Sequence, residues 1–203
     1  MNHYSLSVVT EPTSEPVTLA EARAHLREPS EADNAHIQNC IKAARERAER
    51  YTGRRFMPTV LRLTADRFPC QEIKLPGGAL NSSTTVSVQY LAGDGTLTTL
   101  SSTAYDVDTY SEPARISPKW GTYWPQYRCQ NNAVRVQYTA GYTDASAVPA
   151  GIKSAILLLV GSLYEHREDQ NPGNITRLPL SCEELLKSYQ VGDEFIQYAG
   201  VDD

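Results

Sequence analysis

The side chains that most often carry out chemistry are few in this sequence and lie far apart. The four histidines are His3, His25, His36 and His166. His166 adjoins Glu165, but no second histidine follows at the spacing that an H-E-x-x-H zinc site requires. The G-x-S-x-G pattern of serine hydrolases is also missing. The histidines therefore do not indicate a metal-dependent or nucleophilic enzyme.

Two aspartates are the remaining candidates for a carboxylate pair. Asp106 and Asp108 are two residues apart, so on a strand they share one face. A cation such as Ca²⁺ needs more oxygen ligands than these, and no third ligand lies nearby. The segment Gly151–Ser154 is similar to part of a phosphate loop, but it lacks the preceding glycine and lies inside a predicted helix. We expect no catalytic residue, no metal and no cofactor; a hydrolase that uses Asp106 or Asp108 is an alternative.

The composition is that of a globular chain. Its 203 residues, 40% hydrophobic and 21% charged, can bury a core in one domain or two small ones. The formal net charge of -5 argues against a protein that binds nucleic-acid phosphates over a broad basic face. The cysteines are isolated, which suits a reducing cytoplasm and indicates neither a zinc site nor a disulfide framework; they are Cys40, Cys70, Cys129 and Cys182. Residues 1–12 do not resemble a signal peptide.

An apolar run from Val148 to Asp169 is the strongest structural signal. Pro149 suits the first helical position, and apolar side chains fill nearly the whole circumference of the predicted helix. Lys153 interrupts the run well before the ~18 apolar residues of a membrane span. The helix is therefore either a central core helix or one that other copies of the chain partly cover. Leu158 is the candidate subunit contact on it.

Three further helices are predicted from their end signals. A capping box opens a short helix over residues 18–27, and a longer helix, capped by Ser30 or Asp33, covers about residues 33–53. A second capping box opens a short helix over residues 181–189.

The longer of these helices carries a run of basic residues that indicates either DNA binding or ion pairing. Glu46 and Glu49 are interleaved with the basic residues, and the order Glu46–Arg50 favours a pair along the helix. We therefore prefer a solvated or subunit-facing side to DNA recognition. On this interpretation Arg45, Arg47 and Arg50 form ion pairs between subunits.

Residues 56–147 have the alternation and turn signals of an antiparallel sheet. The predicted strands are 59–65, 72–75, 84–90, 96–100, 105–108, 115–117 and 134–140. Gly93-Asp94-Gly95 predicts a hairpin turn. The aromatic loop Trp120–Trp124 either plugs the fold, contacts another subunit or stacks on bases or sugars.

Together these segments predict an α+β fold in a single domain, residues 1–203. Two long and two short helices form a bundle from residues 15–55 and 148–190, and the sheet of residues 56–147 is inserted between the second helix and the central helix. Residues 1–16 are predicted to form an extended arm. Residues 191–203 are predicted to form a flexible tail that becomes ordered only on a partner.

Several stretches, taken together, resemble one protein family. In chain order they are Glu15–Ala22, Ala43–Arg54, Val134–Tyr142, Val148–Leu159 and Leu163–Glu168. Their order and spacing are similar to those of the head–tail connector family of long-tailed bacteriophages, also called head-completion or neck adaptor proteins. The resemblance is to the longer form, with a sheet inserted between helices, and it covers about residues 15–169.

The resemblance implies a virion structural protein rather than an enzyme. Such a protein forms a homo-oligomeric ring, typically a dodecamer, beneath the portal protein, and the next neck or tail-completion protein binds below it. Genome DNA passes through the lumen without sequence-specific binding, and no membrane is involved. The resemblance therefore implies assembly in the host cytoplasm and a final location in the neck of the virion.

The C-terminal segment is the candidate portal contact, because connectors of this family similarly hold the portal with terminal segments. Its apolar residues have no evident core to join; they are Leu185, Leu186, Tyr189, Phe195, Ile196 and Tyr198. A segment of this kind can become ordered on a partner, and a frayed tail without a role is the alternative.

A protein of a different class also fits the sequence. It is a monomeric, β-rich binding module with the Trp120–Trp124 loop as its ligand site. The size of the protein in solution, measured with and without portal, distinguishes this module from a connector.

Overall fold

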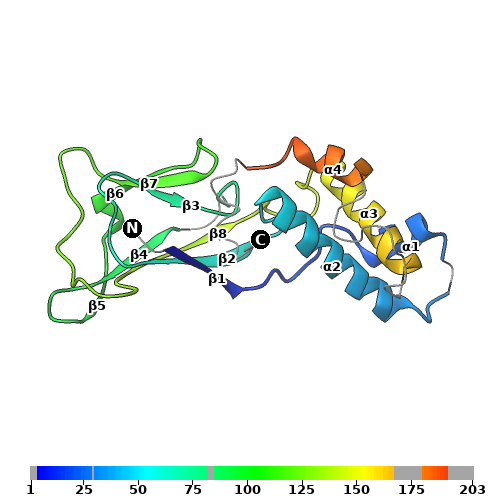
Figure 1. The fold of residues 1–203 in the computed structure, drawn as a ribbon, viewed down its shortest axis with the longest axis horizontal. Coiled ribbons are helices and arrows are strands. Elements are labelled where there is room, and N and C mark those ends of the chain that lie inside the picture. The colour runs from blue at the N-terminus through cyan, green and yellow to red at the C-terminus, as the bar shows by residue number, and fades with distance from the viewer. Residues whose placement is uncertain (1–3, 29, 82–84, 167–179, 192–203) are drawn as a thin grey trace. The chain divides into compact units, whose positions relative to one another are not determined.

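The computed structural model describes residues 4–28, 30–81, 85–166 and 180–191 (Figure 1). It has the predicted α+β class, with four helices and antiparallel sheets. The chain divides into two compact units, each built from separate stretches. The β unit consists of the residues up to Pro12, Gly53–Thr143 and the residues from Val191 on; the helical unit consists of Thr13–Thr52 and Asp144–Gln190. That the two form a single domain stays a prediction.

The larger sheet of the β unit has five antiparallel strands in the order β1-β2-β8-β4-β5. Their bounds are β1 Tyr4–Thr10, β2 Thr59–Ala65, β4 Ser87–Leu91, β5 Leu97–Thr99 and β8 Val134–Ala140. Strands β2 and β8 have the bounds that their alternating pattern predicts. In β2 every second residue, including Leu61 and Leu63, is buried, while the residues between them are half-buried.

The smaller sheet has the order β3-β7-β6, so the insertion holds two sheets rather than the one that was expected. Its strands are β3 Ile73–Leu75, β6 Tyr105–Asp108 and β7 Ala114–Pro118, and a short 3-10 helix, η1, covers Ser102–Ala104. Buried side chains of both sheets, such as Leu61, Val136 and Ile116, form one core cluster. The buried Tyr138 hydroxyl donates a hydrogen bond to the Pro76 carbonyl at 2.7 Å, which satisfies its polar group inside this core.

Residues Tyr4–Thr10 form strand β1, whereas the sequence predicts an extended arm over residues 1–16. It pairs with β2 from Tyr4 opposite Ala65 to Val8 opposite Leu61, and a bulge follows before Thr10. Apolar and polar residues alternate along the first part of β1, and Leu6 packs against the core cluster. The β unit therefore includes a strand from before the helices.

The helical unit contains α1 Leu19–Leu26, α2 Asn34–Thr52, α3 Ala150–Glu165 and α4 Leu180–Lys187. The predicted capping box of α1 is confirmed, since the Thr18 amide donates to Glu21 Oε2 at 2.7 Å and the Glu21 amide donates to Thr18 Oγ1 at 3.2 Å. The bond from the Thr18 amide also lowers the pKa of Glu21 below its ordinary value. Helix α4 begins at Leu180, so Ser181 lies in its first turn and does not cap it.

Helix α3 packs against each of the other three helices and forms the centre of this unit. Its buried face includes Ile152, Ile156 and Leu159, and α2, which packs against it, buries Ile37 and Ile41. Cys182 of α4 is buried against the same helix, with its sulfur 3.8 Å from the Ala155 carbonyl oxygen. The prediction of a central core helix is confirmed for this face.

Candidate subunit and partner interfaces

Arg45 is predicted to lie between subunits, but it is buried inside the helical unit of its own chain. Its Nε donates to Glu15 Oε2 at 2.7 Å, and its Nη1 donates to Glu49 Oε2 at 3.1 Å. The side chains of Arg45 and Glu49 are each 2% exposed. Burial alone would lower the pKa of Arg45, but the bond to Glu15 and the charge of Glu49 outweigh it and raise that pKa. Arg45 thus ties the segment before α1 to α2 within one chain.

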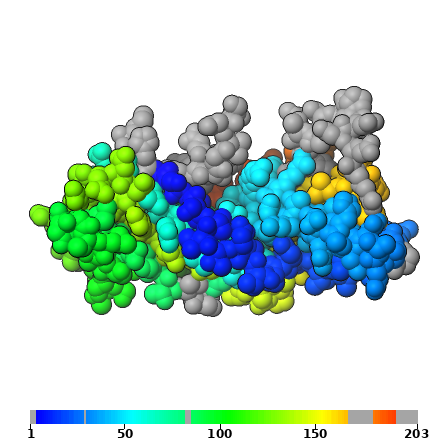
Figure 2. All heavy atoms as spheres, turned by 90° about the horizontal axis from the view of Figure 1, so that it is seen from below, coloured from blue at the N-terminus to red at the C-terminus, as the bar shows by residue number. Residues whose placement is uncertain are grey.

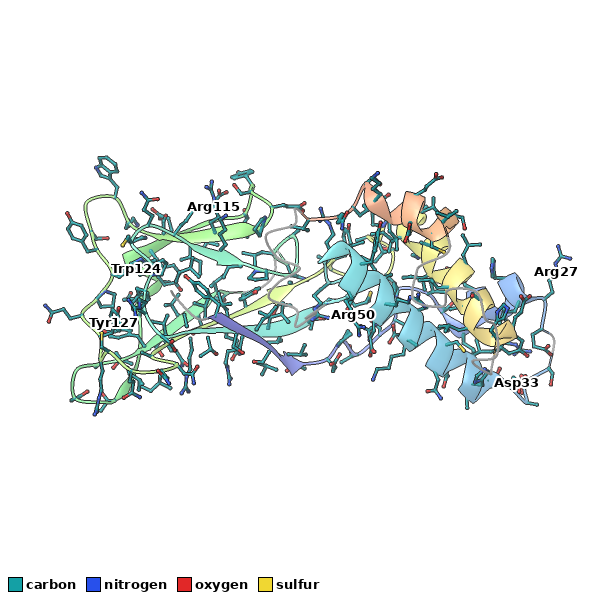
Figure 3. The ribbon with its side chains drawn as sticks, in the orientation of Figure 1. Arg27, Asp33, Arg50, Arg115, Trp124 and Tyr127 are labelled. Atoms are coloured by element: carbon teal, nitrogen blue, oxygen red, sulfur yellow. The ribbon has the colours of Figure 1, made fainter. Side chains whose placement is uncertain are left out.

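The other basic residues of α2 lie nearer the surface. Arg50 is exposed (Figure 3), Arg47 is half-buried, and Lys42 Nζ lies 3.9 Å from Glu46 Oε1. Among the described residues Arg50 has no ion-pair partner, because Glu46 pairs with Lys42 and Arg45 instead. Their role between subunits stays a prediction, and the exposed Arg50 is the best placed of the three arginines for it.

The helical unit also carries exposed leucines. Leu158 on α3 is 37% exposed and Leu185 on α4 is 36% exposed, while Leu180 at the start of α4 is more open still. Leu158 therefore lies on the surface, where a second copy can reach it. No helix in the described part of the chain is long and apolar enough to cross a membrane.

The predicted portal-docking residues occupy different environments. Leu185 is exposed and Tyr189 is half-buried, with its ring against Gly151. Leu186 is fully buried, so it is a core residue of the helical unit and not part of its surface. The remaining candidates, Phe195, Ile196 and Tyr198, lie outside the described residues.

The aromatic loop serves two purposes. Trp124 stacks on Phe68 with a ring-centroid distance of 4.7 Å, and Tyr127 packs edge-on against the same ring at 5.4 Å (Figure 3). Trp120 and Tyr123, in contrast, are 96% and 93% exposed. An open surface pocket of about 480 Å³ lies between the loop and the Phe68 segment. The base of the loop therefore plugs the β unit, as one of the predictions has it, while its tip presents two aromatic rings to solvent.

The two aspartates do not form a paired site. Asp106 is exposed, and Asp108 is bonded to Ser111 and Arg115, with Arg115 Nη2 at 2.8 Å from Asp108 Oδ2. These hydrogen bonds, the one from Ser111 first, hold the pKa of Asp108 far below its usual range. An aspartate held ionised in this way cannot donate a proton near neutral pH. Within the described residues, no three metal-ligating side chains lie close enough to hold an ion.

Strand β1 carries interface candidates that the sequence reasoning missed. Val8 and Val9 are both exposed near the end of a strand that forms one edge of the larger sheet. The signal was present, because Tyr4, Leu6 and Val8 alternate with Ser5 and Ser7. Two prolines downstream favoured an arm over a strand.

No family model and no curated protein matches the sequence. Among solved structures, a chain in the neck of an empty gene transfer agent (GTA) particle, computed with C6 symmetry, has a TM-score of 0.76 and 22% identity. A chain in the neck of the native GTA particle, computed with C12 symmetry, has a TM-score of 0.74 and 21% identity, and a chain in the virion of the native particle has 0.72 and 22%. Each match covers 92% of this chain and 95% of the other. Over nearly its whole length, this protein therefore has the fold of a chain found in these gene transfer agent particles.

Proposed function

We propose that this protein is a structural component of a phage-type particle neck, where it forms a ring that joins the DNA-filled head to the tail. The observation that carries the proposal is the similarity of fold to a chain in neck structures, which spans 92% of this chain. The ordered sequence likeness to head–tail connectors also supports it, because that likeness lies in short stretches of sequence and does not depend on the fold.

A ring requires surfaces that copies of the chain can share. The similar necks were computed with C6 and C12 symmetry, and cyclic symmetry places equivalent subunits around one axis. The exposed Leu158 and Arg50 of the helical unit are surface features that fit such contacts.

The ring would lie beneath the portal protein, with the DNA exit channel along its axis and the next neck protein below. The segment from Ser181 onward would hold the portal, with Leu185 and Tyr189 as its described contacts. A net charge of -5 suits a channel wall, since a strongly basic wall would hold the phosphates of passing DNA. The protein would act without catalysis and would reside in the virion neck.

Imaging of particles that carry a labelled copy of this chain tests the proposal. We expect the label between head and tail, in a ring around the channel axis. A label on the head shell or the tail fibres, or particles that contain no copy of the chain, would overturn it. Removal of the gene provides a second readout, because heads without a connector are expected to release their DNA.

The alternative of a monomeric binding module is favoured by one observation, the exposure of Trp120 and Tyr123. Exposed aromatic side chains on a formed loop are typical binding hot spots. The two proposals differ in solution, because the module stays monomeric in the presence of portal while the connector assembles on it. Mass measurement of the chain with and without portal separates them.

A further inference from the structure

The edges of the two sheets differ in how they are protected. Natural proteins block open strand edges with charged residues or proline, because an unblocked edge recruits another strand. In the smaller sheet, the edge strand β3 carries Lys74, and the edge strand β6 carries Asp106 and Asp108. In the larger sheet, neither edge strand, β1 nor β5, contains a charged residue or a proline. Among the described residues, the larger sheet therefore lacks charged or proline protection on both edges, and only the shortness of β5 and the bulge near the end of β1 limit strand addition there.

The β1 edge has seven residues without a charge, and two exposed valines lie near its end. Every second residue of an antiparallel strand directs its amide and carbonyl away from the neighbour, so β1 offers hydrogen-bonding groups to a further strand. Val8 is 38% exposed and Val9 41% exposed, and the bulge between Val8 and Thr10 is the one irregularity of the pairing with β2. Figure 2 shows this N-terminal segment, in dark blue, lying open on one face of the molecule.

The β5 edge matches it from the opposite side of the same sheet. Leu97 is 47% exposed, and Leu97 and Thr99 are the exposed residues of this strand. Four antiparallel pairings separate β1 from β5, so the two strands run in the same direction. The register links Ser5 to Thr99 in one row across the sheet, through Thr64, Arg135 and Gln89.

We propose that β5 of one copy pairs in parallel with β1 of the next copy, so that the larger sheets of neighbouring subunits join into one continuous sheet. This inference rests on the proposed ring. A cyclic ring needs two different, complementary surfaces on each subunit, and the two uncharged edges provide them. Neighbouring subunits of a six- or twelve-fold ring differ by a small rotation, so equivalent strands of neighbours run in nearly the same direction, as a pairing of β5 with β1 in parallel requires. Pairing of β1 with a second β1 would instead form an antiparallel dimer and consume the edge.

Disulfide trapping tests the pairing. The exposed Cys70 and Cys129 are first changed to serine, while the buried Cys40 and Cys182 stay. Two double variants, Ser5→Cys with Thr99→Cys and Ser7→Cys with Thr99→Cys, then place thiols on the two edges at exposed positions on one face of the sheet. Three single variants, each with one of these cysteines, serve as controls.

Particles that carry each variant are oxidised and separated on a denaturing gel without reductant. We expect at least one double variant to form a ladder of linked subunits longer than a dimer, and the single variants to remain unlinked. Rings without any ladder would overturn the edge pairing and leave the proposed function standing. Dimers from Ser5→Cys or Ser7→Cys alone would also overturn it, because they indicate pairing of β1 with β1.

A charge on the edge gives a second, independent readout. Val8→Lys adds a protecting charge at an exposed position, and Asp106→Lys changes a charge on the already protected β6 edge. We expect Val8→Lys to keep its circular dichroism spectrum and to lose ring assembly, and Asp106→Lys to assemble like the natural chain. Assembly of Val8→Lys at the natural level would overturn the inference, whereas absence of the natural chain from the neck would overturn the proposed function itself.

Discussion

Arg45 shows at the scale of a single residue how burial changes the meaning of a charge. A row of arginines on a helix indicates a surface for partners, yet this guanidinium is held inside its own chain by Glu15 and Glu49. A buried ion pair adds little net stability against apolar residues of the same size, but it is costly to break on one side. Its loss is therefore expected to affect folding and not assembly.

Replacement of Arg45 by methionine should lower the free energy of unfolding by about 3–5 kcal/mol, because it removes the guanidinium that pairs with the buried carboxylate of Glu49. Urea denaturation measures the change. The exposed Arg50→Met is the matched control, for which we expect a change within about 0.5 kcal/mol. A similar small effect for both variants would mean that Arg45 is not buried in solution.

Gly141 is a second residue whose position in the fold requires one residue type, glycine. Its φ is +107°, and a Cβ added there would lie 2.4 Å from the Met57 carbonyl oxygen. The left-handed backbone alone costs a larger residue on the order of 1–3 kcal/mol, and the clash adds to it. Gly141→Ala should therefore lower the midpoint of thermal unfolding clearly. Gly93→Ala, where no atom lies within 4 Å, should leave the midpoint nearly unchanged; equal shifts would contradict this account.

At the scale of the elements, α3 contributes side chains both to the core of the helical unit and to its surface. Leu158 and Leu159 are neighbours on this helix, but Leu158 is exposed and Leu159 is buried. Leu158→Asp should therefore fold normally and fail to assemble, because the charge lies in the proposed subunit contact. Leu159→Asp should unfold the helical unit, because it buries an unpaired carboxylate. Circular dichroism and mass measurement in the presence of portal distinguish the two; normal assembly of Leu158→Asp would place that residue outside the contact.

Local patterns predicted most elements, and long-range pairing explains those they did not. Strands β2 and β8 follow from strict alternation, and α1 from its capping box. The division into two sheets depends on which strands pair, and no local signal encodes that choice. Strand β1 also alternates, but two downstream prolines favoured an arm, and the pairing that makes it a strand, with Ser7 bonded to Arg62 across 55 positions, is not visible in the local sequence.

The interface residues were predictable only in part, for a related reason. A helical wheel identifies apolar and charged positions, but the packing of α4 decides that Leu186 is buried and Leu185 exposed. In the same way, the stacking of Trp124 on Phe68 separates it from the exposed Trp120 of the same loop. Predicting whether a given side chain is buried or exposed therefore requires the tertiary structure.

At the scale of the whole molecule, the C-terminal residues are predicted to attach the protein to the portal. Deletion of residues 192–203 should leave a folded protein, since Val191 is the last buried residue that the structure describes. Heads that carry the shortened protein should fail to retain it and should lose DNA. The full-length triple variant Phe195→Ser, Ile196→Ser and Tyr198→Ser separates the loss of apolar contacts from the loss of length. Docking and infectivity at natural levels would place the portal contact elsewhere, with the Trp120–Trp124 loop as the next candidate.

The acidic balance of the whole chain predicts weak interaction with DNA. With a net charge of -5 and Arg45 neutralised inside the fold, the isolated protein should bind duplex DNA no more tightly than about 10⁻⁴ M at physiological salt, without sequence preference. Fluorescence anisotropy with two unrelated duplexes over a range of salt concentrations measures this. Tight binding that persists at high salt would indicate specific recognition and contradict a passive channel wall.

The interleaving of the two units in the sequence has a consequence for how the protein is made. Strand β1 is made before its partner β2, which follows only after α1 and α2, and the sheet lacks β8 until residue 140 is made. Helix α2 likewise waits for α3, which begins at Ala150. A nascent chain that ends before Val134 therefore has neither core complete, and its uncharged N-terminal strand stays unpaired. Because distant contacts must form before they stabilise the chain, both units are expected to fold nearly together, and only after β8 and α3 have been made.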